Sequence, residues 1–443
     1  MDFKNIRCPF DWTPFIFVCN KMYLEEMIRM YMCIDLKSFY ASVECIVHGY
    51  DPFKTALVVA DSSRGMGAIT LAATPYIKKL GVKSRGRLYE IPKNIEYICQ
   101  KPRMSLYIKY SCMVYDIYLK YFSQEDIHVY SIDESFIDIA PYMKLYNKNP
   151  MDMAKMVIDD IYETLGLTAT AGVGDNMYLA KIAMDIIAKH DPTNIGYLSS
   201  GLYIKLLSHH RPLSDFWQIG SGIERHLAKL NIFDMEGIRR CDDNILYKEF
   251  GVNAEYLIMH AKGLDDTTIK DIKEYKPKSK SISESQILER NYSYNEAKLC
   301  LLEMLDNKCI ELVRSNLSPM GISLMIGYDE KYYANYTGGS KKMDMATNLF
   351  SNLKVELLYL YEATTIKNIP IRRIGISFFS FKSFNELNLF TDKKREEKEG
   401  ILYKTISAIK AEYGRGSIFK GMNLLEGATA LKRNKLLGGH NRE

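Results

Sequence analysis

The chain has 443 residues, of which 47% are hydrophobic and 26% are charged, and this length is too great for a single hydrophobic core. No apolar run approaches the roughly 18 residues that a membrane helix needs, and the nine cysteines include no CxxC pair. This composition argues against a membrane protein and against a disulfide-stapled secreted domain, so we expect a multidomain, cytoplasmic protein with reduced thiols.

Charge is unevenly distributed along the chain. From residue 276 to the end there are 27 Lys and Arg against 19 Asp and Glu, whereas the preceding part has 32 against 35. A basic C-terminal part suggests a polyanionic partner. Many solvated surfaces are also basic, so charge alone does not identify that partner.

Strands and helices are predicted to alternate up to about residue 190. Apolar runs predict buried strands at 30–36, 55–61 and 168–174, and helical spacing predicts helices at 38–47, 105–122 and 152–165. The segment HVYSIDESFIDIA (128–140) is rich in Val, Ile, Tyr and Phe, which predicts one further strand. This alternation is typical of an α/β or α+β core.

The pattern changes after residue 190 to short helices, which predict a separate helical domain reaching about Leu264. The polar segment 265–281 contains Pro277 and is predicted as a linker. The sequence then predicts a second α+β domain, with a helix at 294–313, a strand at 320–328, a Gly-Gly turn, a helix at 345–361 and a strand at 372–379. Residues 1–29 match no pattern, and the chain beyond residue 391 is charged and then rich in glycine.

Three carboxylates occupy unusual places in this pattern. Asp35 ends the first strand, and Asp133 and Glu134 stand together in the middle of segment 128–140. Acids are costly to bury without a cation or hydrogen-bond donors, and three converging carboxylates repel one another unless cations lie between them. Oxygen ligands suit Mg²⁺, and two such ions about 4 Å apart can support phosphoryl transfer.

A simpler interpretation is that these acids cap turns or form ion pairs. Neighbouring residues of a regular strand point to opposite faces of a sheet. Asp133 and Glu134 can therefore face one site only if the backbone turns or bulges at this point.

Three further motifs each have a functional and a structural interpretation. Lys181 lies on the polar face of a helix, where it can reach a triphosphate or take part in i, i+4 ion pairs. The segment 211–232 predicts a helix-hairpin-helix, in which the backbone of Gly220, Ser221 and Gly222 can approach a phosphate, or a plain helical hairpin. The motif NELNLF (385–390) is either an edge strand or a peptide that docks into a partner's groove.

Taken together, the motifs resemble the Y-family translesion DNA polymerases, and most closely the UmuC-like (UvrX-like) branch of Gram-positive bacteria. The resemblance extends from about Tyr31 to the end of the chain. It is carried by CIDLKSFYASVE, YSIDESFID, GVGDNMYLAKIA, FWQIGSGI, KSISESQIL, SIFKGMNLLEGAT and RNKLLGGH. Several motifs in the family's order are more specific than any one of them.

The resemblance implies an α+β, multidomain fold with the shape of a right hand. Its implied parts, in chain order, are an N-terminal extension (1–29), a palm (30–60 and 104–190) that contains the fingers (61–103), a helical thumb with the helix-hairpin-helix (191–264), a linker (265–281), an α+β little finger (282–385) and a clamp-binding motif with a C-terminal tail (386–443).

It also implies roles for individual residues. Asp35, Asp133 and Glu134 match the family's catalytic carboxylates, which hold two Mg²⁺ ions together with the backbone carbonyl of Leu36. Tyr40, preceded by Phe39 in the nucleotide site, matches the steric gate that excludes a 2′-OH. Lys78 and Lys181 match triphosphate contacts, although Pro75 stands where better-known members have Tyr. The residues that match the clamp-binding peptide are Glu386, in place of the usual Gln, Leu387, Leu389 and Phe390.

The implied function is template-directed addition of deoxynucleotides to a primer 3′-OH, past damaged template bases, in DNA repair and the SOS response. The implied partners are primer–template DNA, deoxynucleoside triphosphates and the replication sliding clamp, with a monomeric enzyme. Two rivals are a nucleotidyl cyclase and a non-catalytic relative that binds DNA or the clamp. The thumb hairpin and the basic second domain count against the first rival, and the intact acid triad counts against the second.

Overall fold

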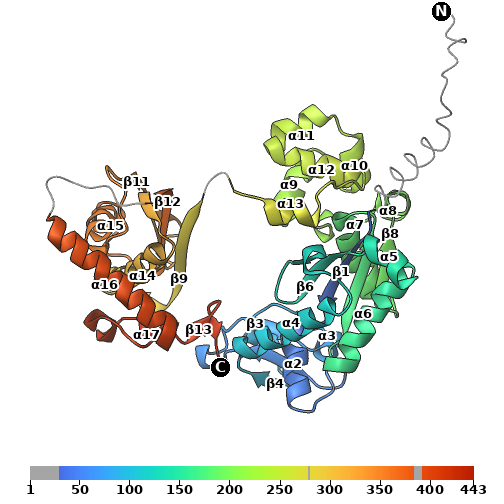
Figure 1. Cartoon of the computed structure of the whole chain (residues 1–443), viewed down its shortest axis with the longest axis horizontal. Coiled ribbons are helices and arrows are strands. Elements are labelled where there is room, and N and C mark those ends of the chain that lie inside the picture. The colour runs from blue at the N-terminus through green and yellow to red at the C-terminus, as the bar shows by residue number, and fades with distance from the viewer. Residues whose placement is uncertain (1–28, 278–279, 384–391) are drawn as a thin grey trace, which may run out of the picture. The chain divides into compact units, whose positions relative to one another are not determined.

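The computed structural model describes residues 29–277, 280–383 and 392–443 (Figure 1). The chain divides into two compact units, and the boundary falls between Tyr275 and Lys276, inside the predicted linker. That linker is not wholly irregular, because helix α13 (Ile269–Glu274) lies within it and buries Ile269. Sequence patterning missed α13 because only two isoleucines interrupt its polar residues.

The first unit is built on a five-stranded sheet with the order β5-β6-β1-β7-β8. These strands are β5 (Ile127–Val129), β6 (Glu134–Asp138), β1 (Tyr31–Leu36), β7 (Ala169–Gly174) and β8 (Ile195–Leu198). The central strand β1 runs antiparallel to both of its neighbours. In this register Asp35 lies opposite Glu134 on β6 and opposite Thr170 on β7.

The prediction of one continuous strand over residues 128–140 is wrong. The chain forms the hairpin β5–β6, and the backbone N–H groups of Tyr130 and Ser131 each donate to the Glu134 carbonyl at 3.0 Å. Ser and Asp favour turns because their side chains bond nearby backbone groups, and here that preference outweighs the strand propensity of the flanking residues. Asp133 therefore lies on the turn, and Glu134 is the first residue of β6.

Helix α7 (Met177–Ile182) covers the face of the sheet on which Asp35 and Glu134 lie. It continues into a π-helical turn (Ala183–Ile187) and a 3₁₀ turn (Ala188–His190). A Cβ atom on Gly172 would lie 2.1 Å from the Ala180 carbonyl oxygen, and one on Gly174 would lie 2.5 Å from the Ala180 nitrogen. Glycine at these two positions thus allows α7 to pack backbone to backbone on β7.

Further elements of the first unit flank this sheet. Helices α4 (Met104–Leu119) and α6 (Pro150–Leu165) pack together, and α6 lies against β7 and β8. The predicted fingers segment (61–103) supplies two strands of a second sheet in the order β3-β2-β4, whose central strand β2 comes from the predicted palm segment, and α2 (Phe39–Val47) packs on two of its strands. The bounds of its elements are β2 (Leu57–Ala60), β3 (Thr70–Ala73), α3 (Pro75–Lys79) and β4 (Ile98–Gln100).

Short helices follow β8 and share a hydrophobic core with residues of α7. They are α8 (Ser200–Leu207), α9 (Ser221–Lys229), α10 (Met235–Arg240), α11 (Asp243–Phe250) and α12 (Ala254–Ala261). One more helix of the first unit, α5 (Ala140–Tyr146), follows β6. Among the described residues, no helix combines the length and the hydrophobicity needed to cross a membrane.

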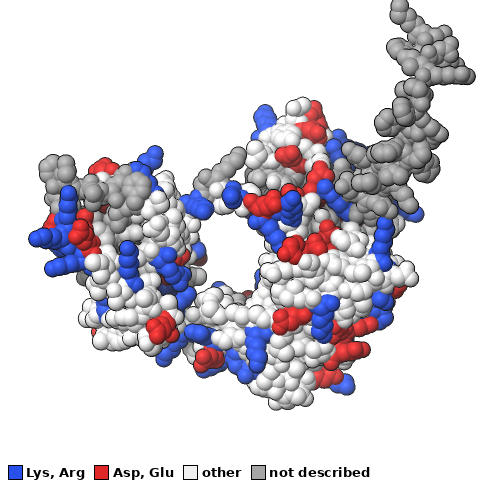
Figure 2. Space-filling model, viewed as in Figure 1, with Lys and Arg blue, Asp and Glu red and all other residues white. Residues whose placement is uncertain are grey.

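The second unit contains a four-stranded antiparallel sheet in the order β11-β10-β12-β9. Its strands are β9 (Ser281–Tyr292), β10 (Ser318–Tyr328), β11 (Tyr336–Lys342) and β12 (Ile371–Lys382). Helices α14 (Tyr294–Arg314) and α15 (Phe350–Thr364) bury one face of this sheet. The view in Figure 2 shows several Lys and Arg side chains on the second unit.

The opposite face of this sheet carries small polar residues. The strand registers align four serines in one row across the sheet, namely Ser340, Ser323, Ser377 and Ser283. On β10 and β12 the serines alternate with apolar residues that face α14 and α15. The face that carries the serine row also carries larger side chains, among them Phe379 and Met325.

One prediction for this half of the chain is wrong, and one helix had not been predicted. Gly338 and Gly339 lie inside strand β11 and not in a turn. The charged segment beyond residue 391 contains the 21-residue helix α16 (Lys393–Tyr413), which packs on α14. Only Tyr403 of α16 is buried, so the helix has no apolar stripe for a sequence to reveal. The short elements α17 (Ala430–Arg433), β13 (Leu436–Leu437) and β14 (His440–Asn441) follow it.

Replacing Gly172 with Ala should destabilise the first unit. The added methyl group would overlap the backbone of α7, and overpacking of this kind costs roughly 1–3 kcal/mol or more. Both tryptophans, Trp12 and Trp217, precede residue 276, so urea unfolding followed by tryptophan fluorescence reports on this unit.

Gly201→Ala is the matched control, because a Cβ atom there meets nothing within 4 Å. Alanine in helix α8 should leave stability unchanged or raise it by up to about 1 kcal/mol. Equal stabilities for Gly172→Ala and the wild type would contradict the close contact between α7 and β7.

Candidate active site

Three carboxylates lie at the end of strand β1. Asp35 and Glu134 are directly paired across β1 and β6, and Asp133 precedes Glu134 on the hairpin turn. The Leu36 N–H donates to the Asp133 carbonyl at 2.9 Å, which ties this turn to the end of β1. The Ser131 hydroxyl donates to Asp133 Oδ1 at 2.7 Å. The turn that both acids require to face one site is therefore present.

Asp35 is electrostatically unfavourable in the folded chain. Burial is the main cause that raises the pKa of its carboxyl to about 6, with the charges of Asp133 and Glu134 adding to it and those of Lys189 and Lys181 opposing it. Desolvation and like charges both disfavour an ionised carboxylate. A cation placed between these groups would remove both penalties.

Glu134 already has a counter-ion within the protein. Lys181 Nζ lies 2.8 Å from Glu134 Oε1 and 2.9 Å from Asp185 Oδ2. The Cys33 thiol also donates to Glu134 Oε1, at 3.3 Å. Burial by itself would lower the pKa of Lys181, but Cys33 and the two carboxylates outweigh it and raise this pKa above its ordinary value. Lys181 is thus a firmly charged, internal partner of Glu134.

This placement does not support the prediction that Lys181 contacts a triphosphate. Its side chain is only 9% exposed, and its ammonium group is occupied by two carboxylates. Helical spacing identified the polar face correctly but could not tell which lysine on that face remains accessible.

Sequence reasoning missed Lys189, which lies near Asp35. Its Nζ pairs with Asp185 Oδ1 at 2.6 Å, and its side chain is 40% exposed. Burial lowers the pKa of Lys189, but Asp35 and Asp185 together raise it above its ordinary value. The only feature of the sequence that points to Lys189 is its i, i+4 spacing from Asp185.

Two more lysines are electrostatically coupled to Asp35. Lys78 donates to the Ser38 hydroxyl at 2.8 Å, and Lys37 donates to the Asn194 side chain. Burial lowers the pKa of both lysines, and Asp35 opposes this effect in each case. Lys78, a predicted nucleotide contact, is therefore within electrostatic range of Asp35, and its contact with a nucleotide stays a prediction.

Tyr40 and Phe39 open helix α2 beside the acids. Tyr40 is partly buried, and its pKa is raised by burial and by Asp133, with Arg85 opposing. Phe39 is 2% exposed, and its ring centroid lies 5.6 Å from that of Tyr40. The aromatic ring of Phe39 thus belongs to the core beneath the site, whereas that of Tyr40 reaches its edge.

The residues fit a hard divalent cation, although they are not preassembled around one. Within the described ranges, no group of three or more His, Cys, Asp or Glu side chains is already arranged to hold a metal ion. The ammonium group of Lys181 pairs with the Glu134 carboxylate, and the Ser131 hydroxyl donates a hydrogen bond to the Asp133 carboxylate. The donors are nevertheless all oxygen atoms, and Asp35 carries an unrelieved charge, which is the chemistry that Mg²⁺ suits.

The predicted phosphate-binding hairpin is simpler than expected. A single 3₁₀ turn (Leu213–Asp215) takes the place of its first helix, and α9 begins at Ser221. Gly220, Ser221 and Gly222 are all exposed, and no side chain caps the start of α9. The predicted clamp-binding residues Glu386, Leu387, Leu389 and Phe390 lie outside the described residues.

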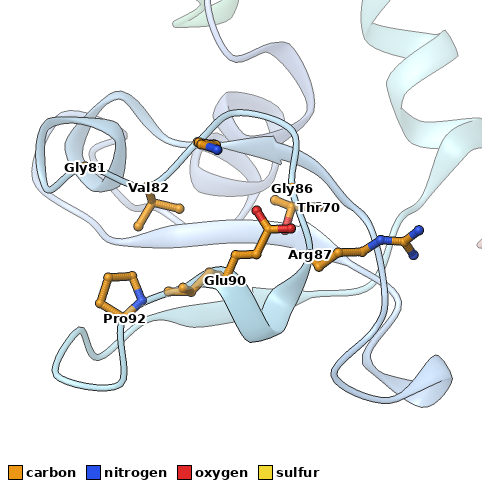
Figure 3. Close-up of a pocket in the computed structure, with 9 residues that line it drawn as sticks. Thr70, Gly81, Val82, Gly86, Arg87, Glu90 and Pro92 are labelled. Carbon is orange, nitrogen blue, oxygen red and sulfur yellow. The ribbon is translucent and has the colours of Figure 1, made fainter.

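The predicted fingers segment also contains a pocket of about 390 Å³ (Figure 3). Its walls include Thr70, Gly86, Arg87, Glu90 and Pro92. None of the carboxylates and lysines described above lines this pocket, so it is separate from the acidic site.

Replacing Asp35 with Asn should stabilise the metal-free protein at pH 8. The folded-state pKa of Asp35, about 6, exceeds the ordinary value of 3.8. The contribution of Asp35 to the free energy of unfolding is therefore fully present below pH 3.8, where the carboxyl is protonated. This contribution is lost as the pH rises through 6. Without this ionisation, Asp35→Asn should unfold with a free energy about 1–3 kcal/mol higher at pH 8 in EDTA, and the difference should shrink towards pH 4.

Asp159→Asn is the control, since Asp159 is 48% exposed and forms a surface pair with Lys155. Its effect should stay below about 1 kcal/mol at every pH. A destabilised Asp35→Asn protein at pH 8 would show that the charge of Asp35 is favourable.

Comparison with known proteins identifies the family. Residues 34–185 match the model of the impB/mucB/samB family. The chain is 30% identical over 416 residues to UvrX of Bacillus subtilis (strain 168), a protein named for UV-damage repair, and this covers 92% of this chain and 97% of UvrX. It is 29% identical over 426 residues to DNA polymerase IV 2 of the same organism, covering 93% and 98%.

The fold agrees with this result. A solved Y-family DNA polymerase chimera of Dbh and Dpo4 superposes with a TM-score of 0.61 at 24% identity, covering 79% of this chain and 98% of the chimera. The predicted α+β, multidomain polymerase fold is thus confirmed, whereas the helix-hairpin-helix stays a prediction. The chain belongs to the Y family of DNA polymerases, as its motifs had suggested.

Proposed function

We propose that this polymerase adds deoxynucleotides to a primer 3′-OH by two-metal phosphoryl transfer and that it copies damaged templates in the SOS response. The observation that carries the proposal is the partly buried Asp35, paired with Glu134 and next to Asp133, with a pKa of about 6. A carboxylate held in an unfavourable charged state is a ready ligand for a divalent cation. Relatives named DNA polymerase IV and UvrX support the wider function.

The proposed ligands are the carboxylates of Asp35, Asp133 and Glu134 and the carbonyl of Leu36. Two Mg²⁺ ions bound by them would lower the pKa of the primer hydroxyl and neutralise charge on the departing pyrophosphate. Lys181 keeps the Glu134 carboxylate in position, since its ammonium group lies 2.8 Å from Oε1. Asp133 accepts a hydrogen bond from Ser131 at Oδ1, which leaves its Oδ2 available as a ligand.

Lys189 and Lys78 are the proposed triphosphate contacts, in place of the predicted pair Lys78 and Lys181. Both are coupled to Asp35 and neither is enclosed by two carboxylates. A lysine can meet phosphate oxygens as a mobile point charge. Tyr40 is the proposed steric gate, because it lies at the edge of the site close to Asp133.

Duplex DNA is proposed to lie on the serine row of the second unit. Small residues allow a sugar–phosphate backbone to come close, and serine hydroxyls can donate to phosphate oxygens. The registers place Lys342 and Arg373 on the same face as Ser323. We further propose that the exposed start of α9 at Gly220–Gly222 binds a backbone phosphate and that residues 386–390 bind a sliding clamp.

Primer extension tests the proposed function. With Mg²⁺, the wild type should extend a primer across an abasic site or a thymine dimer. Asp133→Asn and Glu134→Gln should each lose at least about a thousandfold in rate, because several kcal/mol of charge stabilisation disappears. Activity that persists in both variants would refute the metal assignment, and a wild type with no activity would favour a non-catalytic relative.

Lys189→Ala should raise the KM for the incoming nucleotide by roughly tenfold, the effect of losing one charge-assisted contact. Lys155→Ala is the matched control, since Lys155 forms an i, i+4 pair with Asp159 away from the acids. Lys181→Ala should instead lower stability, by about 3–5 kcal/mol, because it leaves buried Glu134 uncompensated. An unchanged KM in Lys189→Ala would exclude Lys189 from the nucleotide site.

A further inference from the structure

The ring of Tyr40 stacks on a second tyrosine from a distant part of the chain. Tyr40 lies in the first turn of α2, and Tyr107 lies in the first turn of α4, two helices that pack directly together. Their ring centroids are 4.4 Å apart, and their planes differ by 15°. One face of the Tyr40 ring is therefore covered by Tyr107.

Tyr107 is itself fixed on both sides. Its residue is fully buried, and its hydroxyl donates to Glu44 Oε1 at 2.6 Å. Arg103, which precedes α4, donates from Nε to the same oxygen at 3.1 Å and from Nη2 to Glu44 Oε2. A planar guanidinium bonded to both carboxylate oxygens is a directional, charge-assisted contact.

The network returns to the helix on which Tyr40 stands. Glu44 lies one helical turn after Tyr40 on α2, so the two side chains share a face of that helix. Tyr107 touches both of them, one through its ring and the other through its hydroxyl. The ring of Tyr40 thus packs against Tyr107 of α4. Tyr107 is in turn held by the buried carboxylate of Glu44, both oxygens of which accept hydrogen bonds.

We propose that Tyr107, held by Glu44 and Arg103, is a positioning residue that sets the selectivity of the polymerase for the sugar. This inference rests on the proposed role of Tyr40 as steric gate. A ring excludes a 2′-OH only if it cannot tilt away from the sugar, and a displacement of about 1 Å is enough to weaken a tightly positioned site. The stacked Tyr107 ring blocks that tilt.

The competing explanation is that Tyr107 only fills the core. In that case its replacement would lower stability or overall rate but would affect deoxynucleotides and ribonucleotides equally. The informative quantity is therefore the ratio of kcat/KM for a deoxynucleotide to kcat/KM for the ribonucleotide with the same base.

The experiment measures this ratio by single-nucleotide primer extension with the full chain. Tyr107→Leu removes the stack, and the ratio should fall roughly three- to tenfold, the range that one aromatic pair contributes. Tyr107→Phe keeps the ring and loses the bond to Glu44, so a smaller fall of about twofold is expected. Because Phe preserves the shape of the core, this variant keeps the test open if Tyr107→Leu does not fold.

The dependence on Tyr40 is tested in a double-mutant cycle. Tyr40→Ala should lower the ratio strongly, and adding Tyr107→Leu to Tyr40→Ala should change it no further. The matched control is Tyr203→Leu, which removes a fully buried tyrosine whose hydroxyl lies 3.1 Å from that of Tyr178 in another hydrophobic cluster. Its ratio should equal that of the wild type.

The outcomes separate this inference from the proposed function. A wild-type ratio in both Tyr107 variants, with a lowered ratio in Tyr40→Ala, overturns the inference and leaves the proposed function standing. An equal fall in Tyr203→Leu also overturns it, because general loosening would then explain the effect. An unchanged ratio in Tyr40→Ala removes the gate from the proposed function, and with it this inference.

Discussion

The backbone contact between α7 and β7 determines the chemistry of the acidic site. Because Gly172 and Gly174 have no side chains, the helix lies close enough for Lys181 to reach Glu134 across the sheet. Without that counter-charge, paired carboxylates at the end of β1 would be unstable in a partly buried setting. The sheet can then hold Asp35 and Glu134 in register, with Asp133 on the adjoining turn.

The lysines around these acids divide into an internal and an accessible group. Lys181 is enclosed and compensates Glu134, whereas the more accessible Lys189 offsets only part of the effect that burial has on Asp35, and Lys78 is coupled to the same carboxylate. The folded chain thereby keeps the Asp35 carboxylate in an unfavourable ionised state, which lowers the stability of the metal-free protein. Binding of a cation would restore that stability. Such a site is poor as a structural ion pair and well suited to an exchangeable ligand.

Sequence motifs located the acids, but long-range geometry decided the finer points. Asp35, Asp133 and Glu134 were found because their residue types conflict with strand propensity. A turn or bulge near Asp133 was required for both acids to face one site, but strand-forming neighbours hid that the segment divides there into two strands. Lys181 was predicted as a triphosphate contact from the resemblance to the family, and helical spacing could not show that two carboxylates enclose it in the folded chain. The stack of Tyr40 on Tyr107 joins distant segments, and no local pattern encodes it.

If duplex DNA lies on the serine row of the second unit, as proposed above, this has a consequence for movement along DNA. Its hydroxyls repeat across four strands and are too short to reach base edges in a groove. A duplex lying there would meet these hydroxyls through its sugar–phosphate backbone, whatever its sequence. No register would be favoured over the next, so translocation would cross only shallow barriers, and the grip would depend on ionic strength rather than on the bases being copied.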